Sequence, residues 1–341
     1  MKKTFSLVFF VLCLTATAVM AMERSFTNFY FGVKAKFTVR VVDENGKPVE
    51  GAKVWASFNM EHRGKSNVDE KLTDAAGVVE VSGRCHSSVG MEITKDGYYR
   101  TWHAIRFFEE GYDIQNGKWQ PYGIVVQVML KKIHRPTPMV VFTNLKFRVP
   151  ECNQDYGFDM EYGALVEPYG PGKIADFYIR HMWEENKQRG HRTLTFSFPN
   201  CLDGAYPIDL IPDSIFKSPY HADNAKEYLK TFTLEMEWDV AVDKFGNVQR
   251  QNIKSKSLEK NQGLVLRTRT KVDKEGNLVS AHFGKIYGEI AVNIFEHTSI
   301  SISGVLFFNP TENDTNLEFD NKDHYELKKG NRIPIGKLLA F

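Results

Sequence analysis

Oxygen-bearing side chains are concentrated in one segment of this 341-residue chain, between residues 309 and 320. In an extended segment every second side chain points the same way, so four oxygen donors of this segment would share one face. Hard cations such as calcium take about six to eight oxygen ligands from carboxylates, amides and water. We predict no cofactor and favour simple solvation or Asx turns for this segment, with a calcium site as the alternative. The four candidate ligands are Asp314, Asn316, Glu318 and Asp320.

The cysteines offer a second kind of chemistry. Of the four cysteines in the chain, Cys13 lies in the N-terminal leader described below, which leaves Cys85, Cys152 and Cys201. An odd number in an oxidising compartment allows one disulfide and one free thiol. Cys152 and Cys201 both lie beside turn-like segments in the second half of the chain, so we favour a disulfide between them, with free, buried thiols as the alternative. No Cys-x-x-Cys or His-x-x-x-His spacing indicates a soft-metal site.

Linear motifs of catalysis are missing from the sequence. The ten histidines show no His-Glu-x-x-His pattern, and there is no Gly-x-Ser-x-Gly elbow and no phosphate-binding glycine loop. A pair of carboxylates of the glycosidase type could still assemble in three dimensions without a linear trace. The catalytic residues, if there are any, are therefore unknown at this level.

The N-terminus has the pattern of a secretory signal peptide. Lys2 and Lys3 precede an apolar run at residues 5–14 that is too short to span a bilayer comfortably, and Val19-Met20-Ala21 has the small residues of a cleavage site. We predict that residues 1–21 are removed near Ala21 and that the product is periplasmic or secreted, with an uncleaved anchor as the alternative. No second apolar run is long enough to span a membrane, so no span is predicted in the mature chain.

Removal of the two leader lysines would leave the chain without net charge. The full sequence has 44 Lys and Arg against 42 Asp and Glu, and the loss of Lys2 and Lys3 gives 42 against 42. No basic excess remains to attract nucleic acid, so no nucleic-acid partner is predicted. The remaining length of about 320 residues suggests two domains.

Short strands separated by turn residues dominate the first domain, which we place at residues 36–132. Apolar and polar residues alternate on both sides of the turn Asn45-Gly46, and this pattern predicts a β-hairpin from Phe37 to Val54. Further strand signals lie at residues 71–81, 92–100 and 124–130. Because no long amphipathic helix is predicted between them, we expect an antiparallel β-sandwich.

Three segments of this domain carry a family resemblance. They are Val41-Val-Asp-Glu-Asn-Gly-Lys-Pro-Val-Glu-Gly-Ala-Lys-Val54, Thr73-Asp-Ala-Ala-Gly77 and Lys95-Asp-Gly-Tyr98. Their order and spacing resemble the carboxypeptidase regulatory-like domain, a transthyretin-like sandwich. The resemblance covers about a third of the chain and implies an accessory module without catalytic residues of its own.

An aromatic excursion between residues 102 and 122 departs from a minimal member of that family. Exposed aromatic rings can stack on sugars or on partner side chains. We name Phe107, Tyr112, Trp119 and Tyr122 as candidate recognition residues, but we favour the alternative that this excursion covers the domain junction.

The second domain is placed at residues 139–341, after a short linker at residues 131–138. Residues 232–242 hold strict period two, which predicts a strand with one buried face. Val242-Asp-Lys-Phe-Gly-Asn247 and Val272-Asp-Lys-Glu-Gly-Asn277 predict two hairpin tips. Asp223 predicts a short helix at residues 221–230, and residues 175–183 fit either a helix or a strand. We expect a larger β-rich sandwich or jelly roll.

Three further segments of the second domain, at residues 162–176, 284–288 and 309–320, are similar to segments of exported bacterial proteins of unassigned function. This resemblance supplies no site residues. Combining the parts, we predict an exported, non-catalytic binding or structural protein of the bacterial envelope or extracellular space, with a glycan or an envelope protein as its partner. The alternative is a glycan- or peptide-acting hydrolase with an accessory N-terminal sandwich.

Overall fold

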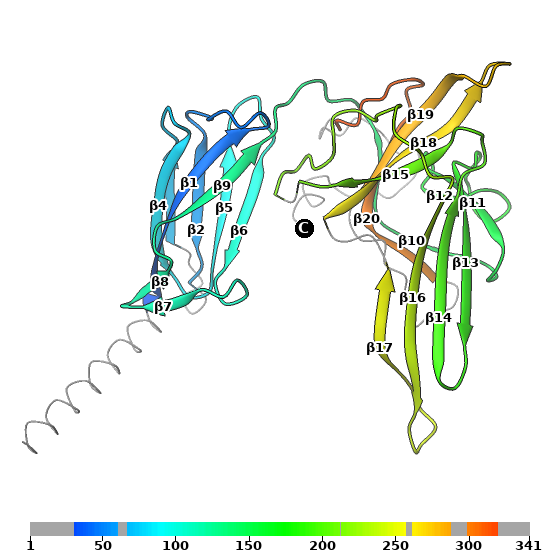
Figure 1. The fold of residues 1–341 in the computed structure, drawn as a ribbon, viewed down its shortest axis with the longest axis horizontal. Helices are drawn as coiled ribbons and strands as arrows, with labels where there is room; N and C mark the ends of the chain where they lie inside the picture. The colour runs from blue at the N-terminus through cyan, green and yellow to red at the C-terminus, as the bar shows by residue number, and fades with distance from the viewer. Residues whose placement is uncertain (1–30, 61–66, 212, 257–260, 288–298, 320–341) are drawn as a thin grey trace, which may run out of the picture. The chain divides into compact units, whose positions relative to one another are not determined.

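The twenty elements in the described part of the chain are all β-strands, which confirms the predicted all-β fold class (Figure 1). This computed structural model describes residues 31–60, 67–211, 213–256, 261–287 and 299–319. The predicted signal peptide lies outside them. Within these ranges no helix could span a membrane.

The chain divides into two compact units, Met1–Ile133 with Asp213–Ile215, and His134–Pro212 with Phe216–Phe341.

The first unit is a sandwich of two sheets. One sheet has the order β4-β1-β8-β7 with β9 also paired to β1, and the other has the order β3-β2-β5-β6. Their facing side chains form one core, in which Phe37 and Val39 of the first sheet meet Val54 and Met91 of the second. The strands are β1 (Val33–Asp43), β2 (Lys53–Phe58), β3 (Asn67–Leu72), β4 (Val78–Cys85), β5 (Ser88–Thr94), β6 (Thr101–Arg106), β7 (Asp113–Gln115), β8 (Lys118–Gln120) and β9 (Ile124–Leu130).

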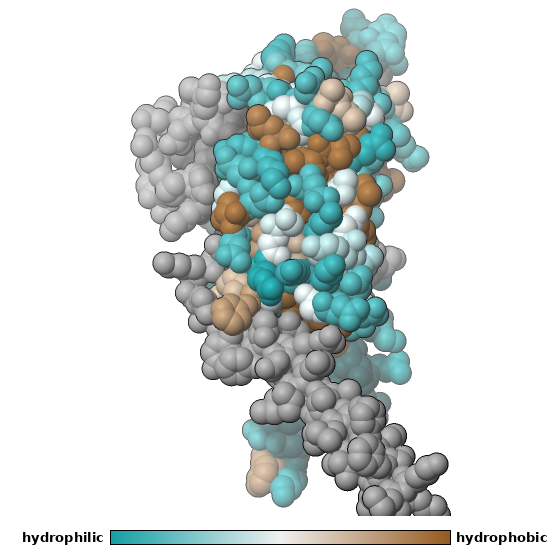
Figure 2. All heavy atoms as spheres, turned by 90° about the vertical axis from the view of Figure 1, so that its left-hand side faces the viewer, coloured by the Kyte–Doolittle hydropathy of each residue, from teal (hydrophilic) through white to brown (hydrophobic). Residues whose placement is uncertain are grey.

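The outer surface of the first unit is mixed in polarity. Figure 2 faces the side that carries β4 and β1, and hydrophobic residues lie there in several patches between hydrophilic ones. A folded domain leaves much of its surface apolar, so such patches need no partner to explain them.

The predicted hairpin from Phe37 to Val54 is wrong in one respect. The tight turn forms, because the Asp43 carboxylate accepts the N–H groups of Asn45 and Lys47, each at 2.9 Å. The two strands, however, lie in different sheets. Pro48 has no N–H to extend the pairing beyond a single bridge to Val42, so the chain crosses from one sheet to the other instead of forming a ladder.

The second unit is a larger sandwich. Its sheets have the orders β10-β20-β19-β18-β15 and β12-β11-β13-β14-β16-β17. The core between them includes Leu266 and Phe308 from the first and Phe158, Phe177 and Phe196 from the second. The strands are β10 (Val140–Arg148), β11 (Asp155–Asp159), β12 (Ala164–Leu165), β13 (Phe177–Glu185), β14 (Arg189–Ser197), β15 (Gly204–Asp209), β16 (Thr231–Val242), β17 (Val248–Lys256), β18 (Gln262–Val272), β19 (Leu278–Tyr287) and β20 (Ser299–Asn309).

The five-stranded sheet of this unit is covered on both faces. Its second face packs under Ala222, Tyr228 and Leu317, and under Leu210 and Phe319. Double coverage explains why β18 is buried almost continuously from Gly263 to Thr268 and does not alternate.

Both predicted hairpin tips of the second unit are confirmed, and the predicted helix is not. β16 pairs with β17, and β18 with β19, around the two Val-Asp-Lys-x-Gly-Asn turns. Residues 221–230 are turns and isolated bridges, because the Asp223 carboxylate accepts the N–H of Ala225 in an Asx turn and does not begin a helix. Residues 177–183 belong to strand β13.

Candidate functional site

The candidate calcium ligands are in contact with other groups of the second unit. Glu318 accepts the backbone N–H groups of His134 and Arg135 at 2.8 and 2.7 Å, and the Arg135 guanidinium donates to Asp314 at 2.8 Å. Asp314 accepts the backbone N–H of Asn316, and Asn316 accepts that of Glu318. These contacts are Asx turns, one of the two interpretations that the sequence offered for this segment. Asp320 lies outside the described residues. Across the part of the chain that the structure describes, no three His, Cys, Asp or Glu residues gather where they could hold a metal.

The candidate recognition aromatics mostly belong to the core of the first unit. Phe107 and Trp119 are buried and stack at 4.4 Å between ring centroids, and Tyr112 meets Phe107 edge-on at 5.3 Å. Tyr122 is partly buried and lies against the ammonium group of Lys118, at 4.6 Å. The prediction of an exposed aromatic surface is therefore wrong for Phe107 and Trp119, because the excursion folds back to complete the core.

The predicted disulfide between Cys152 and Cys201 is not formed, and none of the three cysteines among the described residues belongs to a disulfide. The register of the sheet explains this. Asn153 donates its N–H to the carbonyl of His181, whereas the strand that leads to Cys201 ends at Ser197, opposite Tyr178. Tyr178 lies three residues, or about 10 Å, further along β13. A disulfide needs Cα atoms within about 7 Å of each other.

Cys152 has a different partner. Its Sγ atom lies 3.5 Å from Nδ1 of His181. The side chain of Cys152 is partly buried and that of His181 is fully buried. The turn that carries Cys152 is held over β13 because Asn153 adopts a left-handed backbone conformation, with φ at 64°, and bonds to the His181 carbonyl at 2.6 Å. A thiol beside an imidazole can transfer its proton to the ring and become a nucleophilic thiolate.

A buried cation completes this group. Arg192 pairs with Trp183 across β13 and β14, and Leu194 pairs with His181, so these four side chains point to the same face of the sheet. Arg192 is 1% exposed, and its guanidinium lies 5.3 Å from the centre of the Trp183 ring. Burial lowers the pKa of Arg192 to about 10, and the charge of Cys152 opposes that shift. The guanidinium therefore stays charged at neutral pH.

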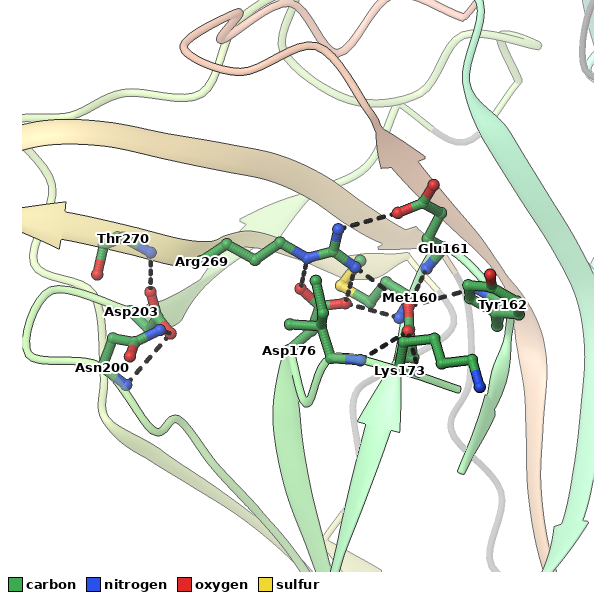
Figure 3. A network of polar contacts seen from close by, with 11 residues as sticks. Met160, Glu161, Tyr162, Lys173, Asp176, Asn200, Asp203, Arg269 and Thr270 are labelled. Carbon is green, nitrogen blue, oxygen red and sulfur yellow. Dashed lines mark hydrogen bonds and ion pairs between the residues drawn. The ribbon is translucent and has the colours of Figure 1, made fainter. Parts of the chain in front are cut away.

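Arg269 anchors a second polar group, which joins the two sheets of the second unit (Figure 3). It lies on a bulge of β18, with φ at 54°, and donates to Asp176 at 2.9 Å, to Glu161 at 2.9 Å and to Asp159 at 3.1 Å. Burial raises the pKa of Asp176, and the hydrogen bond and charge of Arg269 oppose it. Asp159 also accepts four backbone N–H groups of its own loop. Asp159, Glu161 and Asp176 thus all bind Arg269 and help to hold the two sheets together.

Lys285 forms a third polar group on the other face of the five-stranded sheet. Its buried ammonium donates to the Tyr287 hydroxyl at 2.6 Å, to the Leu317 carbonyl at 2.6 Å and to the Ser218 hydroxyl at 3.2 Å. Phe216 and Phe307 present their rings to it at about 4.6 and 4.5 Å. All three N–H donors of the ammonium have an acceptor, and aromatic rings surround it. The Lys285 group therefore joins the segments that carry Ser218 and Leu317 to the sheet.

Of the three groups, only the one at Cys152 combines a nucleophile, a base and a cation with partial exposure. Reactive cysteines occur in such partly exposed, electropositive surroundings. Cys85, in contrast, is fully buried in the core of the first unit, and burial raises its pKa to about 12. Cys201 is exposed on a turn.

No protein-family model and no curated protein matches the chain. Solved structures do match, over about 30% of the chain. They include 3-chlorocatechol 1,2-dioxygenase from Rhodococcus opacus 1CP, with 13% identity, 61% of that chain covered and a TM-score of 0.25. Hydroxyquinol 1,2-dioxygenase from Pseudomonas putida DLL-E4 has 13% identity, 57% coverage and a TM-score of 0.24. The dioxygenase domain of a carbohydrate-binding fusion from Streptomyces sp. SirexAA-E has 10% identity, 83% coverage and a TM-score of 0.25.

These matches correct the functional prediction made from the sequence. The predicted non-catalytic binding or structural role is not upheld, because the solved structures that match are dioxygenases. The chain spans only about six tenths of the length of the first of these enzymes. Similarity at this level carries no activity, cofactor or residue over to this chain.

Proposed function

We propose that the second unit performs thiol redox chemistry, with Cys152 as the nucleophile that reduces a hydroperoxide. The observation that carries this proposal is the 3.5 Å contact between the sulfur of Cys152 and Nδ1 of His181, beside a fully buried Arg192. His181 accepts the thiol proton, and the guanidinium stabilises the sulfur anion. A hydroperoxide is small enough to reach a partly buried sulfur and needs no metal to react with it.

The reaction balances without any other group. The thiolate attacks the outer oxygen of the hydroperoxide, an S–O bond forms and the O–O bond breaks. Sulfur loses two electrons and becomes a sulfenic acid, and the peroxide is reduced to an alcohol or to water. The imidazolium of His181 returns its proton to the leaving oxygen. Arg192 stabilises the negative charge that moves from sulfur to this oxygen.

Trapping of the sulfenic acid tests this proposal. The mature protein is treated with one equivalent of hydrogen peroxide in the presence of a 1,3-dione probe, and the labelled peptides are identified by mass spectrometry. We expect the probe at Cys152, at a rate at least about ten times that at Cys201, because Cys152 has both a base and a cation beside its sulfur. Equal labelling of the two cysteines would refute it. Cys201→Ser is the matched control and keeps the labelling at Cys152.

Two expectations from the sequence complete the proposal. We propose that residues 1–21 are a signal peptide and that the protein acts outside the cytoplasm. The first unit is proposed as a carboxypeptidase regulatory-like module, and the three motifs between Val41 and Tyr98 support this. N-terminal sequencing of the exported protein should begin at or near Met22, and an intact Met1 on the exported protein would contradict the predicted cleavage.

A further inference from the structure

The oxidised form of Cys152 has no second cysteine within reach in its own unit. Asn153 is hydrogen-bonded to the backbone of His181, while the strand that leads to Cys201 passes Tyr178 and continues away from this position. The separation along β13 is about 10 Å before the four residues from Ser197 to Cys201 are added. A disulfide between Cys152 and Cys201 would require the strands to separate.

Cys85 does not provide the second thiol either. It is fully buried among the core residues of the first unit, at the end of β4. A thiol that reacts with a sulfenic acid has to be partly ionised and accessible. Burial raises the pKa of Cys85 to about 12, which keeps it a neutral thiol at physiological pH.

The turn that carries Cys152 is held by hydrogen bonds of its own residues. The side chain of Gln154 donates to the Glu151 carboxylate at 2.7 Å, and the Glu151 N–H is held by the hydroxyl of Tyr156 at 3.0 Å. The neighbours Glu151, Asn153 and Gln154 are exposed, whereas Cys152 points inward to His181. To reach the oxidised sulfur of Cys152, a thiol on a protein has to pack the surface around it against this turn. A low-molecular-weight thiol has no such surface.

From these three observations we infer that Cys152 is regenerated by a low-molecular-weight thiol through a mixed disulfide, without an intramolecular disulfide. This inference rests on the proposed function. The small thiol attacks the sulfenic sulfur, an S–S bond forms, the S–O bond breaks and water leaves with the thiol proton. A second small thiol attacks the mixed disulfide, which releases the Cys152 thiol and an oxidised disulfide of the reductant.

A two-step mass measurement on the full mature chain tests the inference. The protein first receives one equivalent of hydrogen peroxide and then one equivalent of glutathione as the small thiol, so that no second thiol is left to release the adduct. The expected product carries one glutathione on Cys152, and Cys201→Ser gives the same yield. A peptide that joins Cys152 to Cys201, or a sulfenic acid at Cys152 that survives glutathione, would overturn the inference. If the first step leaves Cys152 unoxidised, the proposed function itself fails, so the two failures are distinguishable.

A second variant examines the role of the turn. In Gln154→Ala the hydrogen bond to Glu151 is lost while the thiol, His181 and Arg192 are unchanged. We expect a dithiol protein of the thioredoxin class to reduce oxidised Cys152 at least several-fold faster in this variant than in wild type, with the glutathione rate unchanged. Wild-type protein that is reduced faster by the dithiol protein than by glutathione at equal thiol concentration would contradict a preference for small thiols.

Discussion

The sulfur of Cys152 lies 3.5 Å from Nδ1 of His181, although 29 residues separate the two in the chain. The contact exists because β11 pairs with β13, with Asp155 opposite Arg180, so that the turn before β11 runs over His181. His181 is fully buried and Arg192 lies on the same face of the next strand. A nucleophile is thus held by one turn against a rigid pair of strands that carries its base and its cation.

Loss of the base should slow the reaction of Cys152 with hydrogen peroxide and leave the fold unchanged. In His181→Gln the side chain still fills the site, but it cannot accept the thiol proton at neutral pH. We expect the second-order rate of Cys152 with hydrogen peroxide to fall about 100-fold, the range for loss of a positioned base. Stopped-flow peroxide consumption measures this rate, and a circular dichroism spectrum equal to that of wild type shows that the fold is kept. A rate within a factor of two of wild type would contradict the assignment.

Loss of the cation between the sheets should cost stability. In Arg269→Met three carboxylates lose their common partner, and Asp176 and Asp159 are fully buried. We expect the free energy of unfolding to fall by about 3–5 kcal/mol, measured by urea titration. Arg180→Met is the control, because Arg180 pairs with Asp155 on the surface and the loss of an exposed ion pair should change the free energy of unfolding far less. Equal effects of the two substitutions would argue against a structural role of Arg269.

Gly190 should not tolerate a side chain, because its backbone lies against Trp238. A Cβ atom at this position would be 2.0 Å from Cε2 of the Trp238 ring. We expect Gly190→Ala to destabilise the protein by about 1–3 kcal/mol, the range for overpacking a core. The double variant with Trp238→Leu should recover most of this loss if the clash is the cause. Additive losses in thermal unfolding would show that some other contact limits Gly190.

The two hairpin tips of the second unit should make stability depend on acid pH. Asp243 accepts hydrogen bonds from the Asn247 side chain and from the N–H groups of Asn247 and Phe245, and these lower its pKa. Asp273 has the same contacts with Asn277 and the same direction of shift. A lowered carboxyl pKa contributes stability that is present above the unfolded value of 3.8 and is lost as pH falls through the lower folded value.

We therefore expect Asp243→Asn to lower the midpoint of thermal unfolding at pH 6, with a difference from wild type that shrinks below pH 4. The Asn side chain can still accept the turn N–H groups but does not titrate. Asp273→Asn should behave in the same way. A difference from wild type that stays constant between pH 6 and pH 3 would show that charge on these turns does not contribute.

Local sequence patterns predicted where strands and turns lie in this chain better than they predicted which strands pair in a sheet. Period two in residues 232–242 gave strand β16, and the final strand of the first unit was placed correctly at Ile124–Leu130. The turn after Asp43 was also correct, yet its two strands lie in different sheets. Turn chemistry acts over about four residues, whereas the choice of sheet depends on Val42, Pro48 and the strands that pair with β1 much later in the chain.

The site at Cys152 was missed for the same reason. Phe177, Ile179 and His181 share one face at period two, so a strand assignment for residues 177–185 would have placed this histidine among core residues. The sequence left this segment undecided between helix and strand. Even with that strand, the contact with Cys152 depends on the pairing of β11 with β13, for which the sequence carries no local signal.

The most direct test of the account compares Cys152 in the folded and the unfolded chain. The rate of Cys152 oxidation by hydrogen peroxide is measured at pH 7 by quantitative peptide mass spectrometry, once in buffer and once in 6 M urea after confirmed unfolding. If His181 and Arg192 activate the thiol, the folded protein reacts at least about ten times faster at Cys152, because only the fold brings the base and the cation to the sulfur. A folded rate equal to or below the unfolded rate would contradict the central claim.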